Sequence, residues 1–410
     1  MNLTNLAWKN IWRNKLRSGV ILAAIIIGLT IAVFVVAFSN GMTTQLIRDT
    51  LDREVSHLEI NRQPFLDFGD LEYAFAQHPL EEKILAIPGV TSVSPRIIIN
   101  ATASTSHNIG GVQLVGIDPE KDKTVFKLNQ YIPDSLGSFF EDGIANSIIV
   151  GKKFAEKYQI KLRNKVILTF ADKDGEQFSG AFRVCGIYHT SSPNFEEGNV
   201  FAKTSDLQQL AALPNDSIHR LAINISNYND LQMVASVQNQ IKAMLSGDET
   251  VRNWKEISPM LSMYDSFMGT IFTVIVAIVL FALGFGIVNV VLMSVIERRR
   301  ELSMLRAIGM TRRRVMNMII IESTILTCVG GFIGMIVGGL IVWHTSRTGI
   351  DMSQSMSSYS AVGVSTMIHP AISWATYFQI SVMVILTGIL SAIYPARVAV
   401  KMKPVEGIRI

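Results

Sequence analysis

Four long apolar stretches stand out from the mixed pattern of hydrophobic and polar positions along the chain. They cover residues 20–38, 268–296, 315–343 and 374–394, and none of them contains Lys or Arg. Each is long enough to cross about 30 Å of hydrocarbon as a helix rising about 1.5 Å per residue. The pattern predicts four transmembrane helices, which we place at residues 18–40, 266–296, 315–343 and 374–395.

The segment between the first two apolar stretches, residues 41–265, alternates strand and helix patterns. Runs of β-branched residues bounded by turn signals predict strands at 90–100, 111–117, 147–151, 165–170, 182–188, 220–225 and 251–254. Helical spacing predicts helices at 81–86, 152–158, 205–213 and 231–245. We therefore expect an α-helical membrane protein that carries a large α+β extracytoplasmic domain, in two lobes, inserted between helices 1 and 2.

The charges predict an orientation in the membrane. Basic residues precede the first helix, and seven more lie between residues 298 and 314, whereas residues 344–373 carry only Arg347 and Asp351 as charges. The positive-inside rule then places both termini, the segment 297–314 and the tail 396–410 in the cytoplasm. Residues 344–373 become a short periplasmic loop, and residues 1–17 an amphipathic helix at the cytoplasmic surface.

Two other interpretations of these patterns are weaker. A secretory signal is the alternative for the first stretch, but its core is long and no small-x-small cleavage pattern follows Phe38. Binding to nucleic acid is the alternative for the basic segments. Because residues 41–265 hold 28 acidic and 21 basic residues, the surplus of basic residues is confined to the cytoplasmic segments, where topology and anionic lipids explain it.

Motifs for catalysis and for metal binding are missing from the sequence. No G-x-x-x-x-G-K-[ST] loop, G-x-S-x-G turn or H-x-x-x-H pair occurs. We expect no catalytic residue, no metal site and no cofactor bound by this chain. Any ATP and Mg²⁺ would then be bound by a partner subunit.

The stretch ERRRELSMLRAIGMTRRRV, residues 297–315, predicts a docking element for such a partner. We expect it to continue the second transmembrane helix into the cytoplasm, with Leu302, Leu305 and Ile308 as an exposed apolar edge along one side, and to end in a turn at Gly309. Interleaved acids separate it from a simple stop-transfer cluster. The residues that we expect to couple the chain to an ATPase are Glu297, Arg298, Arg300, Glu301, Leu302, Leu305, Arg306 and Gly309.

The third apolar stretch carries two further features. Gly330, Gly334 and Gly338 recur every four residues, so one face of this helix can approach a neighbouring backbone closely. The neighbour can be in the same chain or in a second subunit. Glu322 is an intramembrane acid, for which a proton relay is one hypothesis. We favour a structural role, in which the carboxylate reaches the cytoplasmic face or pairs with an arginine such as Arg312 or Arg314.

Three segments in order resemble the ABC permease superfamily that includes the lipoprotein-releasing permeases, the macrolide exporter and the cell-division permease. They are AWKNIWRNKLRS at the start, residues 297–315 with the glycine-rich VGGFIGMIVGG, and YPARVAVKMKPVEGIR at the end. In the outer domain, VQLVGIDP, IIVGKKFAEKYQIKLRNKVIL and FRVCGIYHTSSPNFEEGNVF are similar to the lipoprotein-releasing permeases. This resemblance implies an inserted lobe at about residues 120–215.

The resemblance also implies a function. The chain would be an inner-membrane permease subunit that works with a cytoplasmic ABC ATPase dimer and a second permease subunit, in a homodimer or a heterodimer. Motion of its periplasmic domain would extract a lipid-anchored protein or another amphiphilic substrate, with a periplasmic acceptor left open. Efflux of drugs, peptides or toxins is the first alternative, and a permease that activates cell-wall hydrolases is the second.

Overall fold

The structure of the protein is a computed structural model that describes residues 15–78, 80–140, 145–190, 192–228, 230–245, 247–352 and 367–401. The chain divides into two compact units. The helical unit comprises Met1–Thr44, Asp265–Asp351 and Met367–Ile410, and the α+β domain comprises Gln45–Tyr264 and Met352–Thr366. The amphipathic helix expected at residues 1–17 lies almost wholly outside the described residues, as do much of the loop 344–373 and the tail beyond residue 401.

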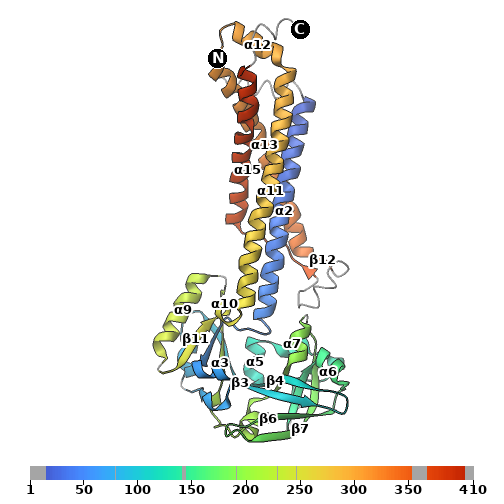
Figure 1. Cartoon of the computed structure of the whole chain (residues 1–410), viewed down its shortest axis with the longest axis vertical. Helices are drawn as coiled ribbons and strands as arrows, with labels where there is room; N and C mark the ends of the chain where they lie inside the picture. Colours follow the sequence, from blue (N-terminus) through green and yellow to red (C-terminus); the bar gives the residue numbers. More distant parts are fainter. Residues whose placement is uncertain are drawn as a thin grey trace. The chain divides into compact units, whose positions relative to one another are not determined.

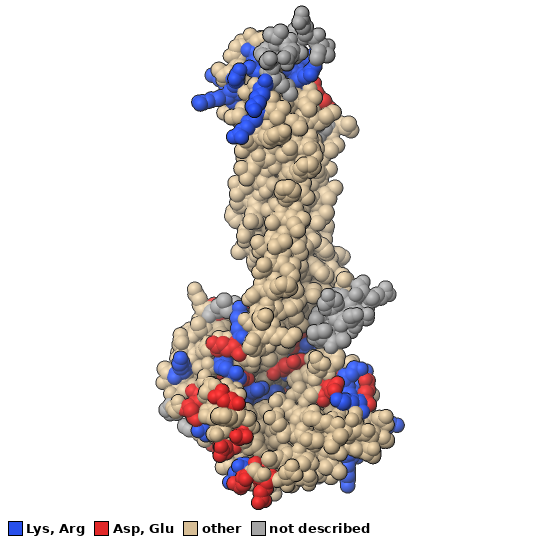
Figure 2. Space-filling view, in the orientation of Figure 1, with Lys and Arg blue, Asp and Glu red and all other residues tan. Residues whose placement is uncertain are grey.

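Four long helices build the helical unit, and each is long and apolar enough to cross a membrane. The helices lie side by side (Figure 1), and a long stretch of their surface shows no charged side chain in Figure 2. All four extend beyond the predicted apolar stretches at one end or both, because hydropathy marks only the part that hydrocarbon surrounds. They are α2 (Lys15–Leu51), α11 (Pro259–Glu297), α13 (Arg312–Thr348) and α15 (Trp374–Lys401).

The α+β domain contains a nine-stranded mixed sheet in the order β11-β1-β10-β3-β4-β8-β5-β7-β6. In chain order the strands are β1 (Leu58–Arg62), β3 (Val90–Ser104), β4 (Ile109–Ile117), β5 (Ser147–Gly151), β6 (Lys165–Ala171), β7 (Gln177–Tyr188), β8 (Asn199–Lys203), β10 (Arg220–Ile225) and β11 (Glu249–Asn253). A small pair of two-residue strands, β2 (Phe75–Ala76) with β9 (Ser217–Ile218), also belongs to this domain, whereas a second such pair, β12 (Ile350–Asp351) with β13 (Met367–Ile368), belongs to the helical unit.

Six of these strands close into a ring, because β6 pairs with β7 on one side and with the end of β3 on the other. Side chains at every second position of β3 point into the ring, as the period of a strand requires. Ile97, Ile99, Ala101 and Ala103 are buried there with residues of the other five strands. The four strands within residues 120–215, β5 to β8, therefore hydrogen-bond into the same sheet as the flanking segments.

The first half of β3 belongs to an open sheet with β10, β1 and β11. One face of this sheet packs against α4 and α9, and Leu58, Ile60 and Ile223 lie in the core between them. The shorter helices of the domain are α3 (Gln63–Phe68), α4 (Leu80–Leu85), α5 (Pro119–Val125), α6 (Lys152–Tyr158), α7 (Pro193–Gly198), α8 (Thr204–Leu210), α9 (Leu231–Met244) and α10 (Trp254–Ile257). Single 3-10 turns lie at Leu71–Tyr73, Leu128–Tyr131 and Asp134–Leu136.

Candidate functional site

A short separate helix, α12 (Arg299–Ala307), lies between the second and third long helices. The expectation that α11 continues unbroken as far as Gly309 is wrong. α11 ends at Glu297, and Arg298 has φ −96° and ψ 15°, outside the helical range. Gly309 has a φ of +105°, which confirms the turn expected there, since L side chains rarely adopt that conformation.

One side of α12 is buried in the helical unit, and it is the side that we expected to be exposed. Leu302 is only 4% exposed and belongs to the core that the four long helices share, with Leu305 packed against it. Of the three apolar residues predicted to form an exposed edge, only Ile308 is exposed, at 77%. The spacing of apolar residues predicted the helix but did not predict which of its sides faces the core.

The exposed side of α12 is a small amphipathic face. Its members share spacings of four, three and one residues, which place them together on one side of a helix. They are Arg300, Met304, Ala307 and Ile308. Met304 is 53% exposed, and it was not among the residues predicted to couple the chain to an ATPase. Its position four residues from both Arg300 and Ile308 is the signal that could have found it.

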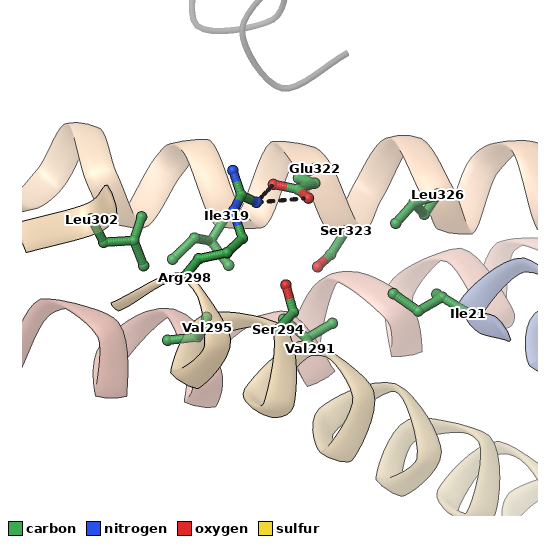
Figure 3. Close-up of a pocket in the computed structure, with 10 residues that line it drawn as sticks. All are labelled: Ile21, Val291, Ser294, Val295, Arg298, Leu302, Ile319, Glu322, Ser323 and Leu326. Atoms are coloured by element: carbon green, nitrogen blue, oxygen red, sulfur yellow. Dashed lines mark hydrogen bonds and ion pairs between the residues drawn. The ribbon is translucent and has the colours of Figure 1, made fainter. Parts of the chain in front are cut away.

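Arginine side chains at both ends of α12 attach the helix to its neighbours. Arg298 Nη1 lies 3.1 and 3.2 Å from the two carboxylate oxygens of Glu322 on α13 (Figure 3), and its Nε donates to Glu301 at 3.2 Å. At the other end, Arg306 Nη1 donates to the main-chain oxygen of Val400 on α15 at 3.1 Å. Three of the predicted coupling residues therefore hold α12 in place.

Glu322 pairs with a different arginine from the two that were expected. Arg312 and Arg314 lie at the start of α13, before Glu322 on the same helix, and both are exposed. Arg298 lies at the break between α11 and α12, and from there its side chain forms an ion pair with Glu322 of α13. The two side chains are only 13% and 11% exposed. The role of a structural ion pair is therefore supported, but its partner was predicted wrongly.

The ion pair borders a small cavity of about 20 Å³ where α2, α11, α12 and α13 meet. Ser294 of α11 and Ser323 of α13 point toward each other there (Figure 3). A space of this size holds about one water molecule. The other lining residues are apolar: Ile21, Val291, Val295, Leu302, Ile319 and Leu326.

Most of the other charged residues near α12 are exposed, whereas Arg299 is half-buried. Glu297, Arg300, Arg312, Arg313 and Arg314 all lie at the surface. Figure 2 shows Lys and Arg side chains gathered at this end of the helical unit. The long middle part of the four helices shows no such charges. The exposed face of α12 is therefore surrounded by basic side chains.

The three glycines of α13 pack against α2 of the same chain. A Cβ atom added at Gly330 would lie 3.0 Å from Ile25, and one at Gly334 would lie 3.1 Å from the main-chain oxygen of Ile26. At Gly338 the nearest atom would be Cβ of Val33, 3.3 Å away. The neighbour that the sequence left open is thus α2.

Two histidines of the α+β domain, His57 and His219, are buried. Desolvation lowers the pKa of both His57 and His219 to about 4. In each ring Nδ1 accepts a main-chain N–H, from Ile225 and from Ile98, so the ring is neutral with its proton on Nε2. Within the described ranges, no group of three His, Cys, Asp or Glu side chains could hold a metal ion.

Comparisons with known proteins match both units. The family described as "MacB-like periplasmic core domain" matches residues 18–244, and "FtsX-like permease C-terminal" matches residues 273–404. An uncharacterised ABC transporter permease of Methanocaldococcus jannaschii is 22% identical over 100% of this chain and 98% of its own length.

Two further relatives carry the name MacB. A macrolide export ATP-binding/permease protein MacB of Bdellovibrio bacteriovorus is 22% identical over 97% of this chain, which spans 60% of that protein's length. The crystal structure of the periplasmic region of MacB from Actinobacillus actinomycetemcomitans has a TM-score of 0.36 at 14% identity, over 53% of this chain and 97% of that one.

The first family match alone covers more than half of the chain, and the second covers the last three long helices up to residue 404. The chain therefore belongs to the family of ABC transporter permeases that join a MacB-like periplasmic core domain to an FtsX-like permease part.

Proposed function

We propose that this chain is the permease subunit of an ABC transporter and that α12 docks a separate cytoplasmic ATPase dimer. The observation that carries this proposal is the exposed face of α12, formed by Arg300, Met304, Ala307 and Ile308. Two apolar side chains beside a guanidinium are exposed on a helix that is otherwise held in the core. Such a face fits a groove on a partner protein, in which apolar anchors give affinity and charges give orientation.

The proposed topology follows from the same end of the molecule. With α12 and its exposed arginines in the cytoplasm, the positive-inside rule places both termini there and the α+β domain outside an inner membrane. ATP binding by the partner would move α12, and the long helices would transmit that movement to the α+β domain. A second permease subunit would complete the assembly, as one copy or as a related chain.

The proposed cargo is amphiphilic. A cavity of about 330 Å³ among α2, α11 and α15 supports this, because its lining is mainly apolar, with Val36, Phe272 and Ile380, and includes Asn40 and Gln379. An alkyl chain with a polar head suits that lining. A lipid-anchored protein is the first candidate, on the sequence resemblance given above. Efflux of a drug, peptide or toxin is the second, because relatives are named for macrolide export.

The docking proposal is tested with Met304→Asp and Ile308→Asp. Both should abolish ATPase binding to the detergent-solubilised permease, because a buried carboxylate without a partner opposes the interface. Met244→Asp is the matched control, since Met244 is an exposed helical methionine of the α+β domain. The two α12 variants must still insert and purify in normal amounts. ATPase binding and stimulation at the level of the control would refute the assignment.

The cargo is tested by depletion of the chain in its native cell. Retention of lipoproteins in the inner membrane would support the first candidate. Normal lipoprotein fractionation together with increased sensitivity to macrolides or other toxic compounds would support the second instead. If neither changes, the amphiphilic cargo is wrong.

A further inference from the structure

We propose that the Arg298–Glu322 ion pair is a positioning element that makes α12 move with α13 and α15, and not with α11, from which it follows in sequence. This inference deepens the proposed function, on which its consequence for transport rests. The mechanical link itself is a property of the chain alone and can be tested without any partner.

The first observation is the break at Arg298. A continuous helix transmits force along its axis, whereas one residue with ψ 15° interrupts the hydrogen-bond ladder between α11 and α12. Leu302 N still donates to the Arg298 carbonyl at 3.0 Å, so α12 begins a new ladder there. The peptide chain therefore gives α12 a flexible joint to α11.

The second observation is that two arginine side chains connect this segment to α13 and α15. Arg298 reaches α13 through Glu322, and Arg306 reaches the main chain of α15 at Val400. Between these two tethers Leu302 is buried in the shared core. A rigid attachment at both ends of a nine-residue helix fixes its position and its rotation against α13 and α15.

The third observation is that α13 and α15 are themselves tightly packed. Gly388 of α15 lies against the side chain of Thr327 on α13, where a Cβ atom would collide with it. Tyr377 of α15 donates to the main-chain oxygen of Met335 on α13. Movement of α12 would therefore carry two long helices, and through the glycine contacts of α13 it would also reach α2.

The ion pair is largely buried, with 13% and 11% of the two side chains exposed. The adjoining cavity of about 20 Å³ has no room for a hydrated counterion. Removing the charge of Glu322 would leave the Arg298 guanidinium paired with Glu301, whose side chain is 43% exposed, so the ion pair that remains is the more strongly screened and the weaker one. Loss of the pair should thus release the N-terminal end of α12.

The link is tested by hydrogen–deuterium exchange of the full-length chain in detergent or nanodiscs. Glu322→Gln should raise amide exchange in α12 by about tenfold and leave the middle of α13 unchanged, since only the tether is lost. Glu322→Asp keeps the charge and should restore most of the protection. Arg314→Gln is the matched control, because this exposed arginine does not contact α12, and it should leave exchange in α12 unchanged.

A second measurement distinguishes a role in transmitting movement from a merely structural role of the ion pair. With the ATPase bound, Glu322→Gln should retain binding but require about tenfold more ATP per cargo molecule moved, with rescue by Glu322→Asp. Unchanged exchange in α12 would overturn the link. Raised exchange with unchanged ATP consumption would overturn its role in transmission. If the wild-type chain binds no ATPase, the proposed function is wrong. The link between α12 and α13 is then tested by the hydrogen–deuterium exchange of α12 alone.

Discussion

The guanidinium of Arg96 donates a 2.7 Å hydrogen bond to the Asp122 carboxylate, although the two side chains are only 3% and 0% exposed. Arg96 lies where β3 changes partners, since it is opposite Arg220 of β10 and opposite Ile117 of β4. Its guanidinium also stacks on Phe126, 3.5 Å from the ring centre. The pair fastens α5 over the junction of the open sheet and the ring.

Removing one member of this pair should strongly destabilise the α+β domain. Asp122→Ala leaves a buried guanidinium without a counter-charge, and we expect the free energy of unfolding to fall by about 3–5 kcal/mol. Urea unfolding read out by limited proteolysis measures the change. Glu120→Ala in the same helix is the control, because the Glu120–Lys123 pair is exposed and should change stability by less than about 1 kcal/mol. Equal effects at the two positions would contradict this account.

The buried histidines predict a loss of stability in mild acid. Their pKa values are about 4 in the folded domain and about 6.5 when unfolded, so the unfolded chain takes up protons first as the pH falls. The stabilisation by neutral rings is complete above pH 6.5 and is lost between pH 6.5 and 4. Each histidine should contribute about 3 kcal/mol over that range. The same urea assay across this pH range measures it.

A histidine variant provides the control for this pH dependence. His219→Gln lowers stability at pH 7.5, because the ring bridges Ile98 N–H and the Leu71 carbonyl and stacks on Phe65. It should nevertheless reduce the slope of stability against pH by about half, since one of the two buried rings is gone. A slope equal to that of the wild type would show that other groups cause the pH dependence.

The glycine face of α13 predicts a position-specific effect. Gly334→Leu should separate α13 from α2, because even a Cβ atom would lie 3.1 Å from the main chain of Ile26. We expect the melting temperature of the purified protein to fall by several degrees. Gly331→Ala is the control, since a Cβ there meets nothing within 4 Å. It should be neutral or stabilising, because Ala favours helix by about 1 kcal/mol over Gly. Equal losses at both positions would exclude α2 as the neighbour.

Leu302 and Ile308 should behave differently although both lie in the same amphipathic segment. Leu302→Ala removes buried methyl groups and should cost about 2–5 kcal/mol. Ile308→Ala removes an exposed side chain and should leave stability within about 0.5 kcal/mol. Thermal unfolding of the purified chain compares them. A larger loss for Ile308 would mean that the burial of α12 is assigned to the wrong side.

Much of the fold was readable because its elements are apolar on both faces or strictly periodic. β5, β10 and α6 begin and end at the predicted residues, since all of β5 and nearly all of β10 are buried and most of the residues in both strands are apolar. β1 was missed because Glu59 and Asn61 alternate with its apolar residues and resemble a surface loop. Both are in fact buried, and Glu59 pairs with Arg220 and Arg252.

The candidate site was less predictable because its geometry depends on tertiary contacts. No Gly or Pro marks the break at Arg298, so local pattern favours one continuous helix there. The break is stabilised by Glu322, which lies 24 residues further along the chain. In α5, the sequence PEKDKTV looks like an exposed charged helix or turn, yet Asp122 within it is fully buried. Single-sequence periodicity does not contain such pairings.

The strand β3 ties the registers of the open sheet and the ring to each other. If β3 slipped by one residue against β10, Ile97, Ile99, Ala101 and Ala103 would turn from the interior of the ring to its surface. A pairing error in the open sheet would thus expose apolar residues of the ring, and the reverse also holds. The correct register of each part therefore favours the correct register of the other. The domain should accordingly fold and unfold as a single cooperative body, with no half that persists when the other is lost.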